Sequence, residues 1–252
     1  ITTSGTAVGN LLPSIMEASY SHTPLIVLTT DRPPELRDCG ANQTCHQTQV
    51  FSRFLRWEVD LPPQGAENYF RSITAQGVFH AAKAHPGPIQ INCQFREPLY
   101  VPTPQLNPGQ SFNLHHCRLV AEPMKVDAKR GLILIGEVPS SPLPILELAN
   151  RLKWPVFADV LSNARLHPTE EQILNFDLIL NTTSIPAPDF VLHFGARLTS
   201  KKILETPVSL HVSPFPSLQD PSRSLGGRVQ SDIACFCDQF EANTDPEWLS
   251  LW

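Results

Sequence analysis

The sequence lacks a long apolar run, a surplus of basic residues and an ordered array of cysteines. Its apolar stretches, such as 131–136, are far shorter than the roughly 20 residues that cross a bilayer. Residues 1–10 contain neither the basic start nor the apolar stretch of a secretory signal. Lysine and arginine number 19 against 24 acidic residues, which gives a net charge of -5 and no sign of a nucleic-acid footprint. We therefore expect no membrane span and no nucleic-acid partner.

The six cysteines are too scattered for a disulfide framework, and a chain of 252 residues can bury a core without cross-links. They are interpreted mostly as free thiols in a reducing compartment. The segment His115-His116-Cys117 has no partner at zinc spacing, and Cys235 and Cys237 would point to opposite sides of a helix. Glycine-rich dinucleotide and phosphate loops and a nucleophile elbow are also lacking. No metal ligand and no catalytic residue is assigned within this chain.

Short apolar runs alternate with helical patterns along the chain, which predicts an α/β fold. Continuous apolar runs are typical of parallel strands that are buried on both faces. Strands are predicted at 24–29, 87–93, 131–136, 154–158, 190–195 and 208–212, and helices at 7–19, 69–83, 144–152 and 233–240. Pro13 interrupts the first helical pattern, where it can kink the helix. A stretch rich in proline and polar residues, 98–112, separates two doubly wound parallel-sheet units.

The segment that follows the first predicted strand has the composition of a ligand loop. Two prolines come directly after Arg32 and stiffen its backbone, and a guanidinium can grip a carboxylate through two hydrogen bonds. Asn42 and Gln43 supply amide groups that can orient a ligand. The alternative is a rigid surface loop in which Arg32 pairs with Asp31 or Glu35, an ion pair worth little when solvated.

Two further segments lie where a strand end meets a helix start. Residues 3–7 are small and include a glycine, which suits close approach of a polar ligand to backbone amides; the alternative is an ordinary helix N-cap by Ser4 or Thr6. Residues 195–202 carry three cations that can attract an acidic substrate, and the alternative is a solvated helix start.

Six short strings together carry a family resemblance. They are TSGTAV at 3–8, DRPPEL at 31–36, DCGANQ at 38–43, INC at 91–93, EPLY at 97–100 and DVLS at 159–162. In this order they resemble the MenD family, the thiamine-diphosphate-dependent 2-succinyl-5-enolpyruvyl-6-hydroxy-3-cyclohexene-1-carboxylate synthases. The resemblance is dense over residues 1–100 and looser from 129 to about 240.

The family has three α/β domains, and the resemblance places this chain within the first two. Residues 1–100 would be the C-terminal part of a truncated pyrimidine-binding domain, 101–128 a linker, and 129–252 the central domain. The family's cofactor-activating glutamate and its Gly-Asp-Gly…Asn signature for metal and diphosphate are expected to lie outside the chain. We therefore expect the isolated chain to be an inactive fragment that holds no cofactor tightly.

The resemblance also implies a reaction and a set of site residues. A transferase of this family decarboxylates 2-oxoglutarate and adds the succinyl carbanion to isochorismate in menaquinone or phylloquinone biosynthesis, using thiamine diphosphate and Mg2+ or Mn2+. The implied substrate-binding residues are Arg32, Asn42, Gln43, Lys201 and Lys202, and those near the cofactor's pyrimidine are Thr3, Ser4, Gly5 and Asn10. Lys202 departs from the family's Lys-Arg pair, so it keeps the charge but loses the bidentate fork.

Two other interpretations stay open on the sequence. One is a non-catalytic module that binds an acidic metabolite through Arg197, Lys201 and Lys202. The other is a different thiamine-dependent decarboxylase or a relative of acetohydroxyacid synthase, against which the string from 31 to 43 argues. The family further implies a homo-oligomer, located in the cytoplasm of a bacterium or in the plastid stroma of a photosynthetic eukaryote.

Overall fold

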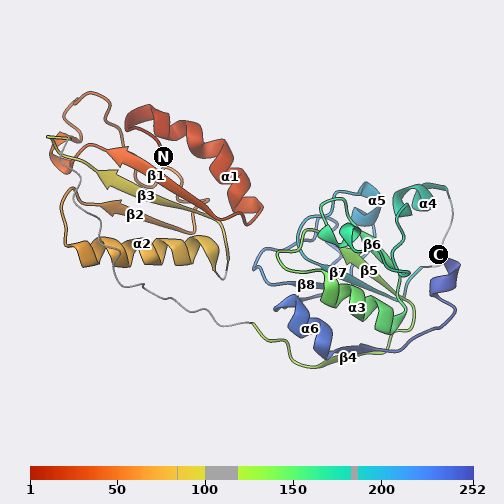
Figure 1. Ribbon diagram of the computed structural model, residues 1–252. Coiled ribbons are helices and arrows are strands. Elements are labelled where there is room, and N and C mark those ends of the chain that lie inside the picture. The colour runs from red at the N-terminus through yellow and green to blue at the C-terminus, as the bar shows by residue number, and fades with distance from the viewer. Residues whose placement is uncertain (84, 100–118, 183–186) are drawn as a thin grey trace. The chain divides into compact units, whose positions relative to one another are not determined.

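The computed structural model describes residues 1–83, 85–99, 119–182 and 187–252. The chain forms two compact units, Ile1–His116 and Cys117–Trp252, and each is described by itself (Figure 1). The α/β class is confirmed, because the strand pairs of both units are parallel and helices flank the sheets. Within the described ranges, no helix is both long enough and apolar enough to cross a membrane.

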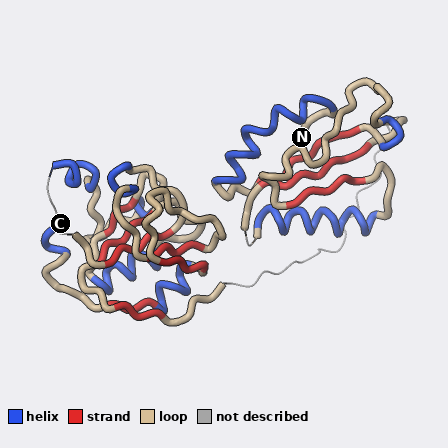
Figure 2. Tube along the Cα trace, turned by 180° about the vertical axis from the view of Figure 1, so that it is seen from behind, coloured by secondary structure: helices blue, strands red, loops and turns tan. Residues whose placement is uncertain are grey.

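The first unit contains a three-stranded sheet in the order β1-β3-β2. Its elements are η1 (Gly5–Leu11), α1 (Leu12–Tyr20), β1 (Leu25–Asp31), η2 (Pro34–Leu36), β2 (Trp57–Leu61), α2 (Glu67–Ala82) and β3 (Pro88–Gln94). Helices α1 and α2 lie on opposite faces of the sheet (Figures 1 and 2). Thr2 forms a parallel bridge with Thr29, so the first residues run along the open edge of β1.

The expected helix 7–19 is divided in two. The chain forms a 3-10 helix through Leu11, and α1 begins at Leu12. Pro13 lies in the first turn of α1, where its missing N–H has no helical partner to lose. The proline therefore marks a helix start and not a kink within one helix.

Strand β3 buries two chemically different faces. Ile89 and Ile91 belong to an apolar cluster with Ala81 of α2. Because side chains alternate along a strand, Gln90 and Asn92 point to the opposite face, and each is 1% exposed. One side of this sheet is thus packed with hydrocarbon and the other with amide groups.

The second unit contains a five-stranded sheet in the order β6-β5-β7-β8-β9 and a separate pair of strands, β10 and β4. Its strands are β4 (Met124–Val126), β5 (Gly131–Ile135), β6 (Val156–Ala158), β7 (Phe190–Phe194), β8 (Leu210–Ser213), β9 (Gly227–Gln230) and β10 (Phe240–Ala242). Its helices are α3 (Leu143–Leu152), η3 (Asn163–Leu166), α4 (Phe176–Thr182), α5 (Lys201–Leu204), α6 (Ile233–Gln239) and η4 (Leu249–Leu251). Strand β4 falls within residues 101–128, the range expected to be a linker.

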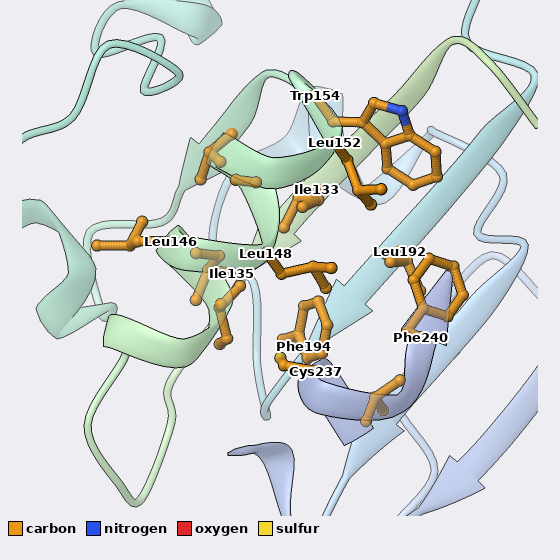
Figure 3. Packing of buried hydrophobic residues seen from close by; sticks show 14 of the residues in the cluster. Ile133, Ile135, Leu146, Leu148, Leu152, Trp154, Leu192, Phe194, Cys237 and Phe240 are labelled. Carbon is orange, nitrogen blue, oxygen red and sulfur yellow. The ribbon is translucent and has the colours of Figure 1, made fainter. Parts of the chain in front are cut away.

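The core of the second unit lies between its sheet and helices α3 and α6 (Figure 3). Ile133 and Ile135 of β5 and Phe194 of β7 meet Leu148 of α3 in this layer, and all four are fully buried. Cys237 of α6 lies in the same layer, and burial raises the pKa of its thiol to about 12. That thiol is therefore a core side chain and not a reactive group.

Several predicted boundaries in this unit differ from the structure by one or two residues. Strand β6 begins at Val156 and not at Trp154. The indole ring of Trp154 packs against Gly131, where an added Cβ would lie 2.0 Å from a ring atom, so this position requires glycine. The helix predicted to end at 240 ends at Gln239, and Phe240 opens β10.

Candidate functional site

The candidate site of the first unit is built where β1 ends. Asp31, the last residue of β1, is buried, and its carboxylate accepts the backbone N–H of Arg32 at 2.8 Å. Ligand groups in parallel α/β sheets gather at the carboxyl ends of strands. The segment expected to hold a ligand therefore begins at the appropriate edge of this sheet.

A second arginine forms ion pairs with the carboxylates near this edge. Arg37 contacts Asp31 at 2.7 Å and Asp60 at 2.9 Å. The hydrogen bond to Asp60 raises the pKa of Arg37 against the opposing effect of burial. Burial also opposes the charge on Asp60, but hydrogen bonds from Arg37, Gln94 and Asn92 outweigh it and lower the Asp60 pKa. These three charges form a fixed ionic cluster at the ends of two strands.

The alternative ion pairs considered for Arg32 do not form. The side chain of Asp31 is taken by Arg37, and Glu35 pairs with Arg96. The guanidinium of Arg32 instead donates from Nη1 to Ser4 Oγ at 3.2 Å. Arg32 is partly exposed. Its guanidinium group is therefore oriented by a neutral hydroxyl, and the carboxylates beside it do not neutralise its charge.

The structure brings several of the expected residues to one short turn, 3–5. Gln43 donates from Nε2 to Thr3 Oγ1 at 2.8 Å and to the Ser4 carbonyl at 3.1 Å. Gly5 has a φ of +84°, a value that favours glycine, and an added Cβ would lie 3.1 Å from Gln43 Cγ. Arg32, Gln43, Thr3, Ser4 and Gly5 therefore form one contiguous group.

Asn42 and Asn10 do not join that group. Both are exposed, and within the described part of the chain no hydrogen bond links either side chain to the turn 3–5. Their expected roles as substrate and cofactor contacts stay predictions.

Buried amides behind the turn were not singled out in the sequence. Gln47 is 1% exposed and binds the Gly5 N–H through Oε1 at 2.6 Å. Its Nε2 donates to the Thr30 carbonyl at 2.9 Å and to Asn92 Oδ1 at 3.0 Å. A signal was present: apolar residues and amides alternate along β3, and amides in a buried strand need partners.

In the second unit, Lys201 and Lys202 open the short helix α5. Ser200 caps this helix through Oγ and the Ile203 N–H. Asp159, at the end of β6, is 1% exposed and accepts the Thr199 N–H at 2.7 Å and the Ser200 N–H at 3.3 Å. The loop that carries the two lysines is thereby fixed to the end of β6.

The two lysines differ in their surroundings. Both are exposed, but Lys202 lies 3.7 Å from Glu205 on the same helix. A cavity of about 490 Å³ lies beside α5, but its lining does not include either lysine. It is lined by His193, Arg197, Leu198, Ile203, Leu204, Thr206, Val208 and residues 218–223. The expected substrate contacts of Lys201 and Lys202 stay predictions.

Comparison with known proteins supports the family resemblance. Residues 109–251 match the family model described as "Middle domain of thiamine pyrophosphate". The whole chain is 32% identical to the 2-succinyl-5-enolpyruvyl-6-hydroxy-3-cyclohexene-1-carboxylate synthase of Rubrobacter xylanophilus and 34% identical to that of Geobacillus thermodenitrificans. The enzyme of the same name from Chloroflexus aurantiacus is 39% identical over 80% of the chain.

The chain spans about half the length of the curated relatives it matches, namely 50%, 49% and 38% of these three. The family model nevertheless covers more than half of the chain. Relatives with one shared name also align along its full length. The chain therefore belongs to the thiamine-diphosphate enzymes as a member of the MenD family.

Proposed function

We propose that the protein containing this chain decarboxylates 2-oxoglutarate and adds the resulting succinyl carbanion to isochorismate. The names of the relatives support this activity. The observation that carries it is the convergence of Arg32 and Gln43 on the turn 3–5. A non-catalytic binding module and an acetohydroxyacid-synthase relative are not favoured by these matches.

The charge of Arg32 suits such substrates. Both carry several carboxylates, and a guanidinium has five donors in a planar fork that matches a carboxylate. One hydrogen bond to Ser4 orients Arg32, and its remaining donors can face a ligand. Asn42 and Gln43, both exposed, offer amide groups on the same loop. In the second unit, Lys201 and Lys202 are proposed to add positive charge toward the same class of substrate.

The fit to the cofactor is partial. Thiamine diphosphate, when bound, supplies the carbon nucleophile for the 2-keto acid, and we propose that Thr3, Ser4, Gly5 and Asn10 lie on its pyrimidine side. Ser4 and Gly5 already have hydrogen-bond partners within the protein. Their proposed role is therefore to shape the surface beside the pyrimidine more than to form hydrogen bonds with it. We propose that Mg2+ or Mn2+ accompanies the cofactor in the complete protein. The described residues of this chain contain no group of three or more His, Cys, Asp or Glu side chains that could hold a metal ion. Homo-oligomerisation and a cytoplasmic or plastid location belong to the same proposal.

Replacement of Arg32 by alanine in the complete protein tests the proposal. We expect kcat/KM for 2-oxoglutarate or isochorismate to fall by about 10- to 100-fold, which corresponds to loss of a charge-assisted hydrogen bond of about 1.5–3 kcal/mol. Steady-state kinetics with each substrate varied in turn provides the measurement.

Arg71→Ala is the matched control. Arg71 is an arginine of α2 that pairs with the exposed Glu67, so its loss should leave kcat/KM unchanged. A complete protein with no thiamine-dependent use of 2-oxoglutarate would refute the proposed reaction. Full activity of the Arg32→Ala variant would remove Arg32 from the site.

A further inference from the structure

Gln47 lies at the centre of a buried hydrogen-bond network that ends at the candidate site. It belongs to the segment between η2 and β2, and both groups of its amide are used. Its own backbone carbonyl accepts Gln90 Nε2 at 3.3 Å. Such a residue is fixed in position and in orientation, since buried polar groups without partners are costly.

The direction of the Gln47 amide is set by two carboxylates that it does not touch. Asn92 Nδ2 donates to Asp31 at 2.9 Å and to Asp60 at 2.7 Å. If the amide group of Asn92 were flipped, its oxygen would face two carboxylates, which are also hydrogen-bond acceptors. Asn92 Oδ1 must therefore face Gln47. Gln47 must then present its NH2 group to Asn92 Oδ1 and to the Thr30 carbonyl. Its Oε1 is left to accept the Gly5 N–H.

The Gly5 contact connects this network to the substrate side of the turn. Gly5 follows Ser4, whose hydroxyl accepts Arg32 and whose carbonyl accepts Gln43. A displacement of the Gly5 backbone would therefore shift both anchors at once. We propose that Gln47 is a positioning residue that holds the turn 3–5 against Arg32 and Gln43 and so sets the geometry of the acidic-substrate site.

The kinetic consequence of this inference rests on the proposed function, whereas the role of Gln47 in holding the turn does not. Gln47→Met keeps the side-chain volume but leaves the Gly5 N–H without its acceptor. The turn then loses the contact that holds it beside Gln43, and misplacement by about 1 Å can cost about 100-fold in rate. We expect kcat/KM for the acidic substrates to fall by about 10- to 100-fold.

A double-mutant cycle between Gln47 and Arg32 distinguishes positioning from general stability. Within the described residues no hydrogen bond joins these two side chains, so a purely structural role for Gln47 predicts that the losses of the single variants multiply. Positioning predicts that Gln47→Met costs much less in an Arg32→Ala background. Gln172→Met is the control, because Gln172 is a buried glutamine of the second unit that bonds the Ala164 and His167 carbonyls. Its effect should multiply with that of Arg32→Ala.

Hydrogen exchange of the Gly5 amide supplies a readout that needs no turnover. Peptides covering residues 3–8 should exchange faster in Gln47→Met than in the unmodified protein or in Gln172→Met. If Gln47→Met does not fold, Gln47→Asn serves instead, since it keeps an amide but withdraws its oxygen by about 1.5 Å. Peptides covering residues 3–8 are again expected to exchange faster than in the unmodified protein.

The outcomes separate the two proposals. Faster exchange at the turn together with non-multiplicative kinetics supports the positioning role. Unchanged exchange at residues 3–8, or losses that multiply fully with Arg32→Ala, overturns it even in an active enzyme. If the protein does not turn over these substrates, the proposed function fails, and the exchange result alone still decides whether Gln47 holds the turn.

Discussion

The sheets of the two units are both covered on two faces, but they bury different chemistry. In the second unit, β5 consists of five buried residues without a polar side chain. In the first unit, β3 alternates apolar residues with buried Gln90, Asn92 and Gln94. Apolar burial is non-directional, whereas hydrogen bonds specify orientation. The comparison teaches that β5 mainly contributes stability, whereas β3 mainly fixes directions at the candidate site.

The energies support this distinction. Full burial of a large apolar side chain contributes about 1.5–3 kcal/mol. A buried hydrogen bond contributes about 0.5–1.5 kcal/mol net, but an orphaned partner costs about 1–3 kcal/mol. The network around Asn92 and Gln47 therefore adds little to stability while it is intact, yet it strongly penalises any other arrangement.

The largest effect on stability is expected for Phe194→Ala in the core of the second unit. Phe194 is fully buried between the sheet and Phe236 of α6. We expect the free energy of unfolding of this unit to fall by about 3–5 kcal/mol. Denaturation that is monitored by hydrogen exchange in peptides of each unit measures this change in the free energy of unfolding. An equal loss in peptides of the first unit would contradict the division into two independently stabilised cores.

Asn92→Leu should have a smaller effect on stability and a larger one on the site. The change leaves Gln47 Nε2 with the Thr30 carbonyl alone and removes a donor from Asp31 and Asp60. We expect the first unit to lose about 1–3 kcal/mol and the turn 3–5 to exchange faster. Asn181→Leu, at an exposed position of α4, is the control. Loss of stability with an unperturbed turn would show that the network does not reach the site.

The smallest effect for each pH unit is a loss of stability on acidification that buried histidines cause. Burial, with a further contribution from His211, lowers the pKa of His193 to about 3, and burial also lowers the pKa of His211. An unfolded imidazole has a pKa near 6.5, so the unfolded chain gains protons first. The stabilisation is complete above pH 6.5 and is lost as pH falls from there toward about 3.

Each such histidine contributes at most about 1.4 kcal/mol per pH unit. In the first unit, burial lowers the pKa of His85 to about 4, so this histidine contributes a dependence of the same sign there. Urea unfolding between pH 7 and 5, with His193→Asn as the variant, measures the slopes. A slope of the second unit that His193→Asn leaves unchanged would exclude this histidine as the cause.

Most buried strands could be predicted because their apolar runs are continuous. Strand β2 was missed because Glu58 and Asp60 interrupt its pattern and its residues are only partly buried. Strand β9 was missed for the same reason, since it contains Arg228 and Gln230. Short or polar edge strands are specified by their neighbours in the sheet, and a single sequence carries little of that information.

The sequence by itself determined the α/β class, the positions of the buried strands and the family, because these depend on local periodicity and on strings that no generic fold requires. It named Arg32 for the site but not the different surroundings of Arg32 and Arg37, since both follow the same strand and have the same chemistry. Tertiary structure separates the two by bringing Asp31 of β1 and Asp60 of β2 together around Arg37. Arg32 is left to the neutral hydroxyl of Ser4, because charges distant in sequence become neighbours only when the strands pair.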